Sequence, residues 1–592
     1  MIKYFIFAGV FMLNFWDLVA QVREKAESSK PNIIFILGDD MGYETLGYKE
    51  VLNFQTPNLD ALAQESTDFT NCDAQPLCVP TRVKLITGQY NYRNYTGWGS
   101  FNLEFLPLGQ MMKAAGYTTA AFGKWHLSKT PEELGFDEFS LFNGSPGELT
   151  YAEFFKRYFY NCPLEENEGA FIADYAPDRF NERTLDFIEK NQDQPFFIYY
   201  PMSLAHNPFE PTPDSVDPTS TDWQQNFEDM VTYADKMIGN VIQKLKENGL
   251  YENTIIIYTT DNGSKTLEHH MSDGEVIYGG KGTTSHDGVH VPLLVKYDGK
   301  RQTSDELVDF TDFYPTFADL AGYDLSAVKE KLDGVSLLPV LDQKQRVGKP
   351  YIFSTFFHPL TTYIRDKDYK LYYDGRLYNL KEDPRELHPF YQQNDSGITA
   401  SARTVLEGLF DDIFENSELS KYPAKHKLLG KYGDYKGLKD EVMLGGYIYD
   451  KLEFTPQAKV IKVDLSKFIS NTEQTYQLRI AREYESSNSG LTYANVKVKH
   501  VKIIKSGKVL RELGSLSLEL KTERDYVKLR ESGNPIISFK MTGDNSMLEL
   551  GKLENSKAGK VELELEVEVS NPDNQWGDRI MLYVFLDRMN SV

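Results

Sequence analysis

The sequence is poor in cysteine and in positive charge. Three cysteines in 592 residues are too few for a disulfide scaffold, which needs several pairs. Lysine and arginine number 64 against 87 aspartates and glutamates, which gives a net charge of −23 at pH 7. This net charge argues against nucleic acid and anionic membranes as partners. If the substrate is an anion, cationic side chains must be concentrated at its binding site.

The sequence also lacks internal repeats, low-complexity tracts and any apolar run of about 20 residues that could span a bilayer. A shorter apolar run, residues 4–16, follows Lys3 near the N-terminus, and Leu18-Val19-Ala20 offers a cleavage site before Gln21. This pattern is typical of a signal peptide. We therefore expect residues 1–20 to be removed and the protein to be exported to the periplasm, the cell surface or the medium. A retained N-terminal anchor is the alternative.

Length and composition indicate a folded protein of more than one domain. Hydrophobic residues make up 41% and aromatic residues 13% of the chain, which is typical of a well-buried globular protein. A chain of 592 residues exceeds what one hydrophobic core normally supports.

Two short apolar runs predict strands buried on both faces of a parallel sheet. Residues 33–37 (IIFIL) are followed by Gly38-Asp39-Asp40, and residues 254–260 are followed by Asp261-Asn262-Gly263. Apolar residues at helical spacing between 227 and 245 predict a helix before the second strand. Strands alternating with helices indicate an α/β fold with a mostly parallel sheet.

The polar residues after these strands predict a metal site. In open α/β sheets, ligands bind at the carboxyl ends of the strands. Asp39, Asp40, Asp261 and Asn262 would supply only oxygen ligands, which suit Ca²⁺ or Mg²⁺ and not zinc. Each motif alone has an ordinary explanation as a capped turn, because aspartate is a common helix N-cap.

A cysteine stands at the start of a predicted helix, in the motif CVPTR at 78–82, which continues to Thr87-Gly88. Proline suits the first turn of a helix. The helix dipole and the free N–H groups favour negative charge at Cys78. A buried structural cysteine is the alternative for this motif taken alone.

In combination, these motifs resemble those of the type I sulfatases, members of the alkaline-phosphatase-like superfamily. The resemblance extends over residues 31–395 and includes GKWH at 123–126 and GGKGTT at 279–284. In that family a maturation enzyme, the formylglycine-generating enzyme, oxidises the cysteine of C-x-P-S/A-R to formylglycine, the nucleophile. Thr81 stands where the family usually has serine or alanine. After this conversion Cys72 and Cys162 remain, and the sequence leaves open whether they pair.

The resemblance implies a set of site residues. The catalytic set would be Cys78, Arg82, Lys124, His126, His206 and Lys281. The metal ligands would be Asp39, Asp40, Cys78 as formylglycine, Asp261 and Asn262, with Ca²⁺ preferred over Mg²⁺. By this resemblance His206 protonates the leaving oxygen with Lys281 as helper, and His126 accepts a proton when sulfate is released.

One stretch departs from the family. After GGKGTT the chain continues as SHDGVH, residues 285–290, and many members have arginine at the position of His290. This leaves the charge on the substrate side of the pocket open. We name Arg93, His286 and His290 as candidates for substrate binding.

The expected architecture follows from the strand and helix patterns together with the family resemblance. The resemblance implies a large mixed, mostly parallel sheet flanked by helices in a catalytic domain at 31–345, with a small α+β subdomain at 346–425. From about Gly430, strand patterns recur without helices between them, which indicates a β-sandwich-like accessory domain at 430–592. That domain is interpreted as a carbohydrate-binding module or as a packing domain.

The predicted function is hydrolysis of sulfate esters on a sulfated carbohydrate. Fragments of a sulfated polysaccharide, such as ulvan, carrageenan, fucoidan or a glycosaminoglycan, fit an exported acidic enzyme with an added β-domain. A phosphate or phosphonate monoester hydrolase of the same superfamily is one alternative. A glycan-binding protein without activity is another, and a purely structural exported protein is a third.

Overall fold

The computed structural model describes residues 30–415, apart from 50, 145–150, 266, 273, 275, 345–348, 357, 374, 387–389 and 391–394, and ten strands between 441 and 589. The predicted signal peptide lies outside the described residues. The chain forms two compact units. Unit 1 comprises Met1–Lys281 and Asp287–Ile352, and unit 2 comprises Gly282–His286 and Phe353–Val592.

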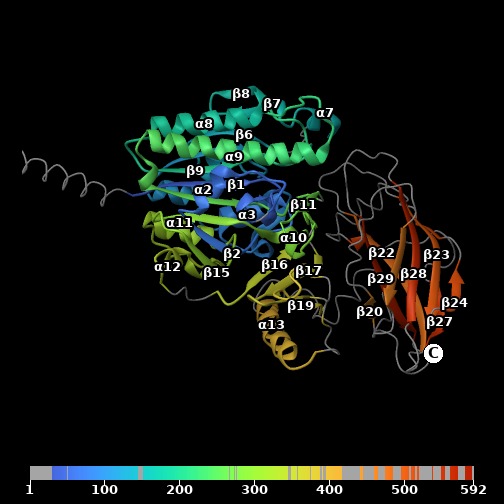
Figure 1. The fold of residues 1–592 in the computed structure, drawn as a ribbon. Coiled ribbons are helices and arrows are strands. Elements are labelled where there is room, and N and C mark those ends of the chain that lie inside the picture. The colour runs from blue at the N-terminus through green and yellow to red at the C-terminus, as the bar shows by residue number, and fades with distance from the viewer. Residues whose placement is uncertain are drawn as a thin grey trace, which may run out of the picture. The chain divides into compact units, whose positions relative to one another are not determined.

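Unit 1 is built on one eleven-stranded mixed sheet, in the order β13-β2-β14-β10-β1-β9-β5-β6-β7-β8, with β15 also pairing with β2. Figure 1 shows the sheet of this unit with helices above and below it. The five central strands, β10 to β6 in this order, are parallel, and antiparallel strands flank them on both sides. The strands are β1 Asn32–Gly38, β2 Thr67–Asp73, β5 Thr118–Lys124, β6 Glu138–Phe142, β7 Tyr160–Glu166, β8 Gly169–Tyr175, β9 Phe196–Pro201, β10 Thr254–Thr260, β13 His290–Val291, β14 Leu293–Lys296 and β15 Gln302–Asp309. Two short pairs lie outside this sheet, β3 Tyr95–Gly97 with β4 Ser100–Phe101 and β11 Glu268–His270 with β12 Val276–Tyr278.

The two predicted apolar strands form the centre of this sheet. All seven residues of β1 and all seven of β10 are buried, and the two strands pair in parallel from Asn32↔Thr254 to Gly38↔Thr260. Strands buried on both faces need apolar side chains at every position, which is why the runs do not alternate. β9 pairs with β1 on the other side.

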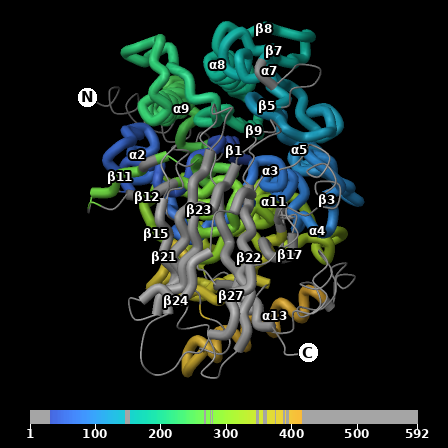
Figure 2. Tube along the Cα trace, turned by 90° about the vertical axis from the view of Figure 1, so that its right-hand side faces the viewer, coloured from blue at the N-terminus to red at the C-terminus, as the bar shows by residue number. Residues whose placement is uncertain are grey.

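Helices cover both faces of the sheet, as Figures 1 and 2 show: α3, α5 and α11 lie on one face and α2, α8 and α9 on the other. Ile33, Phe35 and Leu37 of β1 pack in one core cluster with apolar residues of α3, α5 and α11. The α-helices of unit 1 are α2 Pro57–Ala63, α3 Cys78–Thr87, α4 Asn91–Asn94, α5 Leu108–Ala114, α6 Pro131–Leu134, α7 Tyr151–Lys156, α8 Ala176–Lys190, α9 Trp223–Glu247, α11 Phe313–Ala321 and α12 Leu338–Leu341. A short helix, α10 His286–Val289, lies at a unit boundary. The 3-10 turns are η1 Tyr43–Thr45, η2 Gly47–Lys49, η3 Tyr251–Asn253 and η4 Lys329–Lys331.

The predicted fold class is confirmed: a mixed sheet with a parallel centre, flanked by helices, carries the core. The predicted helix between 227 and 245 is the central part of α9. Among the described residues, we find no helix with the length and apolar character needed to cross a membrane. Cys72 on β2 and Cys162 on β7 are free, buried thiols at distant positions in the strand order.

Unit 2 contains a four-stranded sheet, β16-β17-β18-β19, and the helix α13 Ile398–Glu415. Its strands are β16 Ile352–Phe356, β17 His358–Arg365, β18 Tyr369–Tyr372 and β19 Leu377–Asn379. This small sheet holds the loop 282–286, because Tyr372 donates a hydrogen bond of 2.7 Å to the carbonyl oxygen of Thr284 and Lys370 donates a second one to the same oxygen. The buried carboxylate of Glu386 also accepts a hydrogen bond from each of these side chains. The ammonium group of Lys370 and the hydroxyl of Tyr372 therefore both have a carboxylate partner.

The described strands after residue 440 form two five-stranded antiparallel sheets, β20-β29-β22-β26 with β27, and β21-β28-β23-β24 with β25. They are β20 Glu441–Leu444, β21 Lys459–Asp464, β22 Gln474–Tyr484, β23 Asn495–Lys505, β24 Lys508–Leu513, β25 Leu516–Leu518, β26 Ile536–Ile537, β27 Leu548–Leu553, β28 Val561–Ser570 and β29 Ile580–Met589. The described elements after residue 440 are all strands, as the recurring strand patterns predict. The register of β28 places Glu564 opposite Lys462 on one neighbour and Lys502 on the other.

Candidate active site

The carboxyl ends of β1 and β10 bring four predicted ligands together. Asp39 and Asp40 follow β1, and Asp261 and Asn262 follow β10, its direct neighbour. The backbone N–H of Asp261 donates to the carbonyl oxygen of Gly38 (3.1 Å), which extends the pairing beyond the strand ends. All four side chains are completely buried.

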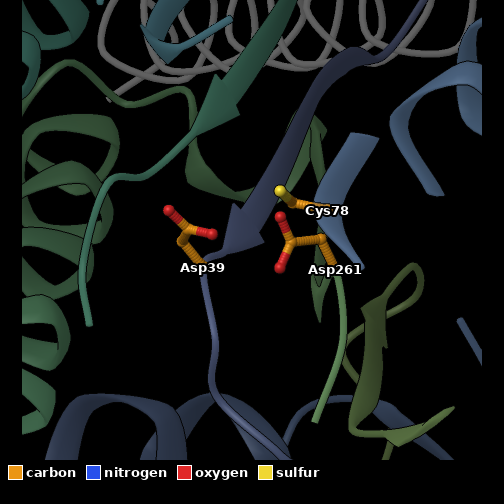
Figure 3. Close-up of side chains that lie close together, drawn as sticks. All are labelled: Asp39, Cys78 and Asp261. Atoms are coloured by element: carbon orange, nitrogen blue, oxygen red, sulfur yellow. The ribbon is translucent and has the colours of Figure 1, made fainter. Parts of the chain in front are cut away.

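Cys78 is the first residue of α3, as the proline two residues later predicts. The helix is held against β10 because Thr81 Oγ1 donates to the carbonyl oxygen of Asp261 (2.7 Å). One ligand atom each of Asp39, Cys78 and Asp261 lies within 4.8 Å of the others. Figure 3 shows these three side chains gathered at the end of β1. Thr81, which departs from the family's usual residue, makes this contact with its hydroxyl.

The donor atoms of this cluster fit a hard divalent cation. Asp39 Oδ1 and Asn262 Oδ1 are buried and have no hydrogen-bond partner among the described residues. A buried oxygen without a partner costs free energy, so both atoms need a ligand. Burial raises the pKa of Asp39 to about 8, against the effect of Lys124, and the nearby carboxylates of Asp261 and Asp40 raise it further. A bound cation would remove this repulsion.

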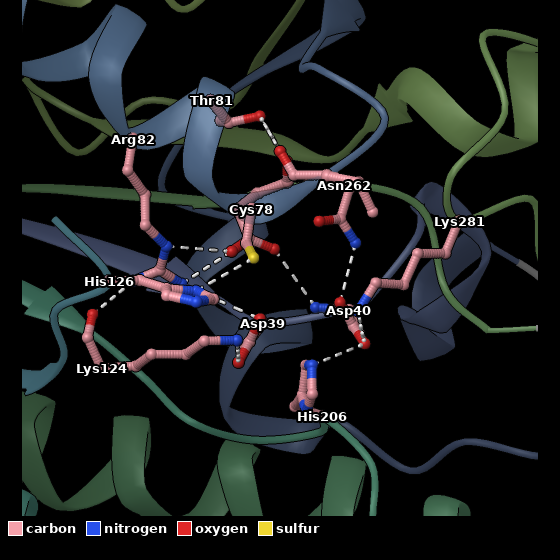
Figure 4. A network of polar contacts seen from close by, with 12 residues as sticks. Asp39, Asp40, Cys78, Thr81, Arg82, Lys124, His126, His206, Asn262 and Lys281 are labelled. Carbon is pink, nitrogen blue, oxygen red and sulfur yellow. Dashed lines mark hydrogen bonds and ion pairs between the residues drawn. The ribbon is translucent and has the colours of Figure 1, made fainter. Parts of the chain in front are cut away.

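Three cationic side chains contact the carboxylates (Figure 4). Arg82 donates to Asp261 Oδ2 from Nη2 (2.6 Å) and Nε (3.2 Å), and it also contacts the carbonyl oxygen of Lys124. Lys124 Nζ donates to Asp39 Oδ2 (2.6 Å), and Lys281 Nζ donates to Asp40 Oδ2. All three cations are at least 96% buried.

The local charge explains how an acidic protein can bind an anion. Three carboxylates, on Asp39, Asp40 and Asp261, face three cations, so the charges of the cluster balance when all three carboxylates are ionised. A divalent cation would therefore leave the site with two positive charges, although the whole chain has a net charge of −23. Charges in a buried site are screened less than charges in water.

Two histidines complete the cluster. His126 Nδ1 lies 3.3 Å from the sulfur of Cys78. His206 Nε2 lies 3.8 Å from Asp40 Oδ2 and has no hydrogen-bond partner among the described residues, while its Nδ1 contacts the carbonyl oxygen of Asn207. Burial and the charge of Lys124 lower the pKa of both imidazoles well below the ordinary value. Every residue of the predicted catalytic and metal sets thus lies in one connected cluster.

Two aromatic residues of this environment were not predicted. The ring of Tyr158 stacks on His206, with centroids 4.9 Å apart and planes 8° from parallel, and the indole N–H of Trp98 donates to His126 Nε2 (3.3 Å). Tyr158 lies between α7 and β7, outside the motifs named above, and Trp98 lies between β3 and β4. Neither position has a sequence pattern that signals contact with a histidine.

The predicted substrate-binding residues lie in different places. Arg93, on α4, forms an ion pair with Asp333 (3.1 Å) and donates to the carbonyl oxygen of Lys331, and no contact recorded for it is with the cluster. The ring of His290 packs against Tyr43, with centroids 4.2 Å apart. His286 belongs to unit 2. Substrate binding by these three residues remains a prediction.

Comparison with family models gives two matches. A model described as Sulfatase matches residues 31–323. A second, described as N-sulphoglucosamine sulphohydrolase, C-terminal, matches residues 274–409. The two matches together include every residue of the cluster and the small sheet of unit 2.

Individual proteins give the same result. The chain is 30% identical over 388 residues to the uncharacterized sulfatase YdeN of Escherichia coli (strain K12), covering 55% of this chain and 69% of the relative. It is 30% identical over 363 residues to the N-acetylgalactosamine-6-sulfatase of Homo sapiens, covering 55% and 68%. Among solved structures, Ps i-CgsB in complex with k-i-k-neocarrahexaose matches with a TM-score of 0.54 and 25% identity, covering 65% of this chain and 92% of that one.

Proposed function

The chain belongs to the sulfatase family and is a sulfuric ester hydrolase, and from this premise we propose that it removes sulfate from a sulfated carbohydrate with a nucleophile derived from Cys78 and a bound divalent cation. The observation that carries the proposal is the buried cluster of three carboxylates and three cations around Cys78. A pocket with net negative charge would repel a sulfate ester. This cluster becomes positive when a divalent cation binds.

The residues around Cys78 suit formylglycine and Ca²⁺. Asp39, Asp40, Asp261 and Asn262 would hold the cation together with the oxygen at position 78, because all are oxygen ligands. Formylglycine at this position would supply a hydrated aldehyde as the nucleophile, which a thiol cannot provide. Burial raises the pKa of the unmodified Cys78 thiol to about 11, even though Lys124 lowers it, so the thiol itself is a poor nucleophile at neutral pH.

The chain's own cations have defined tasks in this proposal. Lys124 and Lys281 neutralise sulfate oxygens, on which charge develops as the ester bond breaks. Arg82 pairs with Asp261 and is fully buried, so its task is to keep the acidic ligands in place.

We assign protonation of the leaving oxygen to His206, with Lys281 as helper. The N–H at Nδ1 contacts the carbonyl oxygen of Asn207, which leaves Nε2 directed at the cluster. A general acid must carry a proton, and the imidazole of the substrate-free site is neutral because its pKa is lowered. The negative charge of a bound ester opposes that shift and favours the protonated ring.

Sulfated carbohydrate is proposed as the substrate class on the basis of the relatives. One relative is an N-acetylgalactosamine-6-sulfatase, and one matched structure contains k-i-k-neocarrahexaose. Export through residues 1–20, maturation by a formylglycine-generating enzyme and an accessory role for residues 430–592 belong to the same proposal. The catalytic domain would be 31–345 and the smaller subdomain 346–425.

The proposal is tested by desulfation of a panel of sulfated oligosaccharides, followed by mass spectrometry on the matured, Ca²⁺-loaded full-length protein. We expect loss of one sulfate from at least one glycosaminoglycan or algal oligosaccharide. Paired kinetics on phosphate and phosphonate monoesters of the same alcohols test the alternative of the same superfamily. A higher kcat/KM on those esters would contradict the proposal, and so would binding of the sugars without turnover.

His206→Ala is expected to affect sugar sulfates much more than activated aryl sulfates. A sugar alkoxide is a basic leaving group that needs a proton, whereas a nitrophenolate does not. We expect kcat on a sugar sulfate to fall by about 10²-fold or more, with a much smaller loss on nitrophenyl sulfate. Lys124→Ala is the matched control. Loss of a contact with the sulfate group does not depend on the leaving group, so it should lower kcat on both substrates by similar factors. Equal losses on both substrates for His206→Ala would move the acid role to Lys281.

Tyr158→Leu is expected to weaken the same step, because the stacked ring holds the imidazole of His206 in place. Aromatic pairs contribute about 0.5–1.5 kcal/mol beyond their buried area, so kcat on a sugar sulfate should fall by about three- to tenfold. Tyr158→Phe keeps the ring and removes a buried hydroxyl that has no partner among the described residues. We expect this control to retain activity and an equal or higher Tm. A Phe variant as slow as the Leu variant would show that the hydroxyl, not the stack, matters.

A further inference from the structure

The turn between β3 and β4 is fixed against the backbone that follows β5, the strand that ends at Lys124. The N–H and the hydroxyl of Ser128 both donate to the carbonyl oxygen of Gly99 at 2.9 Å. Gly99 has φ of +70°, and a Cβ there would lie 3.1 Å from the carbonyl oxygen of His126. Only glycine fits this close approach without strain. The neighbouring residue, Trp98, is therefore held beside His126.

The indole of Trp98 determines which nitrogen of His126 carries a proton. Trp98 Nε1 lies 3.3 Å from His126 Nε2, and the two rings meet edge to face, with centroids 5.6 Å apart and planes 78° apart. An indole N–H can only donate. His126 Nε2 must therefore accept, and the proton of the neutral imidazole is on Nδ1.

The other ring nitrogen faces position 78. His126 Nδ1 lies 3.3 Å from Cys78 Sγ. Turning the ring over would place carbon atoms opposite both Trp98 and Cys78, so the hydrogen-bond pattern assigns the orientation. Gly144 also packs on this ring, because a Cβ at that position would lie 3.1 Å from the imidazole. The ring thus has a fixed plane and a fixed direction.

We propose that Trp98 is a positioning residue that holds His126 in the Nδ1-protonated form, so that the imidazole presents a hydrogen-bond donor to the side chain at position 78. The tautomer follows from the geometry of Trp98, His126 and Cys78 alone. The effect on catalysis rests on the proposed function as well.

With its proton on Nδ1, His126 acts as a hydrogen-bond donor toward position 78. A ring with its proton on Nδ1 has no lone pair directed at position 78, so it cannot accept a proton there. His126 instead orients the oxygen at position 78 by donating to it. The base role predicted for His126 from the sequence would require the ring to lose its Nδ1 proton first.

A second role for Trp98, stacking on a sugar ring, makes a different prediction. The side chain is 39% exposed, and exposed indoles can bind sugars. Loss of a sugar-stacking residue raises KM for sugar sulfates and leaves nitrophenyl sulfate unaffected. Loss of a positioning residue lowers kcat on both substrates, because the oxygen at position 78 acts on both.

The first test reads the tautomer directly. The full-length, Ca²⁺-loaded protein is labelled with ¹⁵N in the histidine rings, and its long-range ¹H–¹⁵N correlations are compared with those of Trp98→Phe, with His126→Gln used only to assign the signals. We expect a protonated Nδ1 and a bare Nε2 at His126 in the wild type, and a shift toward the Nε2-protonated form in Trp98→Phe. The other histidine signals report whether the variant is folded. A wild-type ring protonated on Nε2, or a Phe variant with an unchanged ring, would overturn the proposal.

The second test is kinetic and uses proteins with equal formylglycine content. We expect Trp98→Phe to lower kcat by about tenfold on both a sugar sulfate and nitrophenyl sulfate, with KM little changed. Phe171→Leu is the control, since Phe171 on β8 has the same 39% exposure and lies outside the cluster. A rise in KM on sugars alone would replace the positioning role with sugar stacking. Because the NMR measurement needs no turnover, failure of the proposed function would not be mistaken for failure of this inference.

Discussion

Cys78→Ala is expected to abolish turnover, with a loss of at least about 10⁴-fold in kcat on every sulfate ester. The cluster contains no other cysteine among the described residues, so none of its other members could be converted to formylglycine in place of Cys78. The measurement is the initial rate of sulfate release by protein co-produced with a formylglycine-generating enzyme. The peptide that contains residue 78 is analysed by mass spectrometry in parallel.

Cys162→Ala is the matched control for this prediction. Cys162 is also a buried free thiol, on β7, and its change to alanine removes the same atoms. It should cost some stability through the small cavity it leaves, but it should not change kcat. In the wild type, the Cys78 peptide should lose its thiol and react with hydrazides. Full activity from protein in which Cys78 is entirely thiol would refute the proposed nucleophile.

Removal of the metal is expected to abolish activity and lower Tm, and Ca²⁺ should restore both. An ion bound only by the native state stabilises it by about 2.7 kcal/mol at a concentration a hundredfold above Kd. Asp261→Asn should remove most of this response. The variant also leaves Arg82 without its charged partner, so it should unfold at lower temperature even without metal. The informative quantity is therefore the difference between the Tm values with and without Ca²⁺. The destabilisation caused by the lost Arg82–Asp261 pair lowers both values and cancels in this difference.

Asp235→Asn serves as the control for the metal prediction. Asp235 is equally buried, but it accepts hydrogen bonds from the backbone N–H groups of Asn58 and Leu59. The variant should lower Tm by a similar amount with and without Ca²⁺. Elemental analysis of the wild type should find one divalent ion per chain in the cluster. Indifference of the wild type to prolonged chelation would argue against the metal site.

The sequence predicted the centre of the site because its residues follow strongly patterned elements. Continuous burial on both faces makes β1 and β10 recognisable, and their parallel pairing brings Asp39 and Asp261 to one edge of the sheet. Cys78 was recognisable because proline in the first turn marks the start of α3. Local rules of this kind depend only on neighbouring residues.

The residues around the histidines could not be predicted in the same way. Tyr158 contacts His206 and Trp98 contacts His126, each from a segment without a periodic sequence pattern. These contacts depend on how segments far apart in the sequence pack together. Arg93 has Asp333 as its ion-pair partner, a pairing that its own surroundings in the sequence do not indicate. Side-chain direction at such positions is decided by tertiary packing, which a single sequence does not express.

The loop 282–286 limits where this protein can be recombined with its relatives. The loop belongs to the second compact unit, since Lys370 and Tyr372 bind the carbonyl oxygen of Thr284, yet it directly follows Lys281 in the chain. A chimera joined only at residue 352 would combine a foreign loop with this small sheet, and the backbone of that loop would have to place a carbonyl oxygen at the same point for Lys370 and Tyr372. Exchange of the C-terminal module therefore requires two crossover points, and the five residues after Lys281, the lysine that pairs with Asp40, must be exchanged with it.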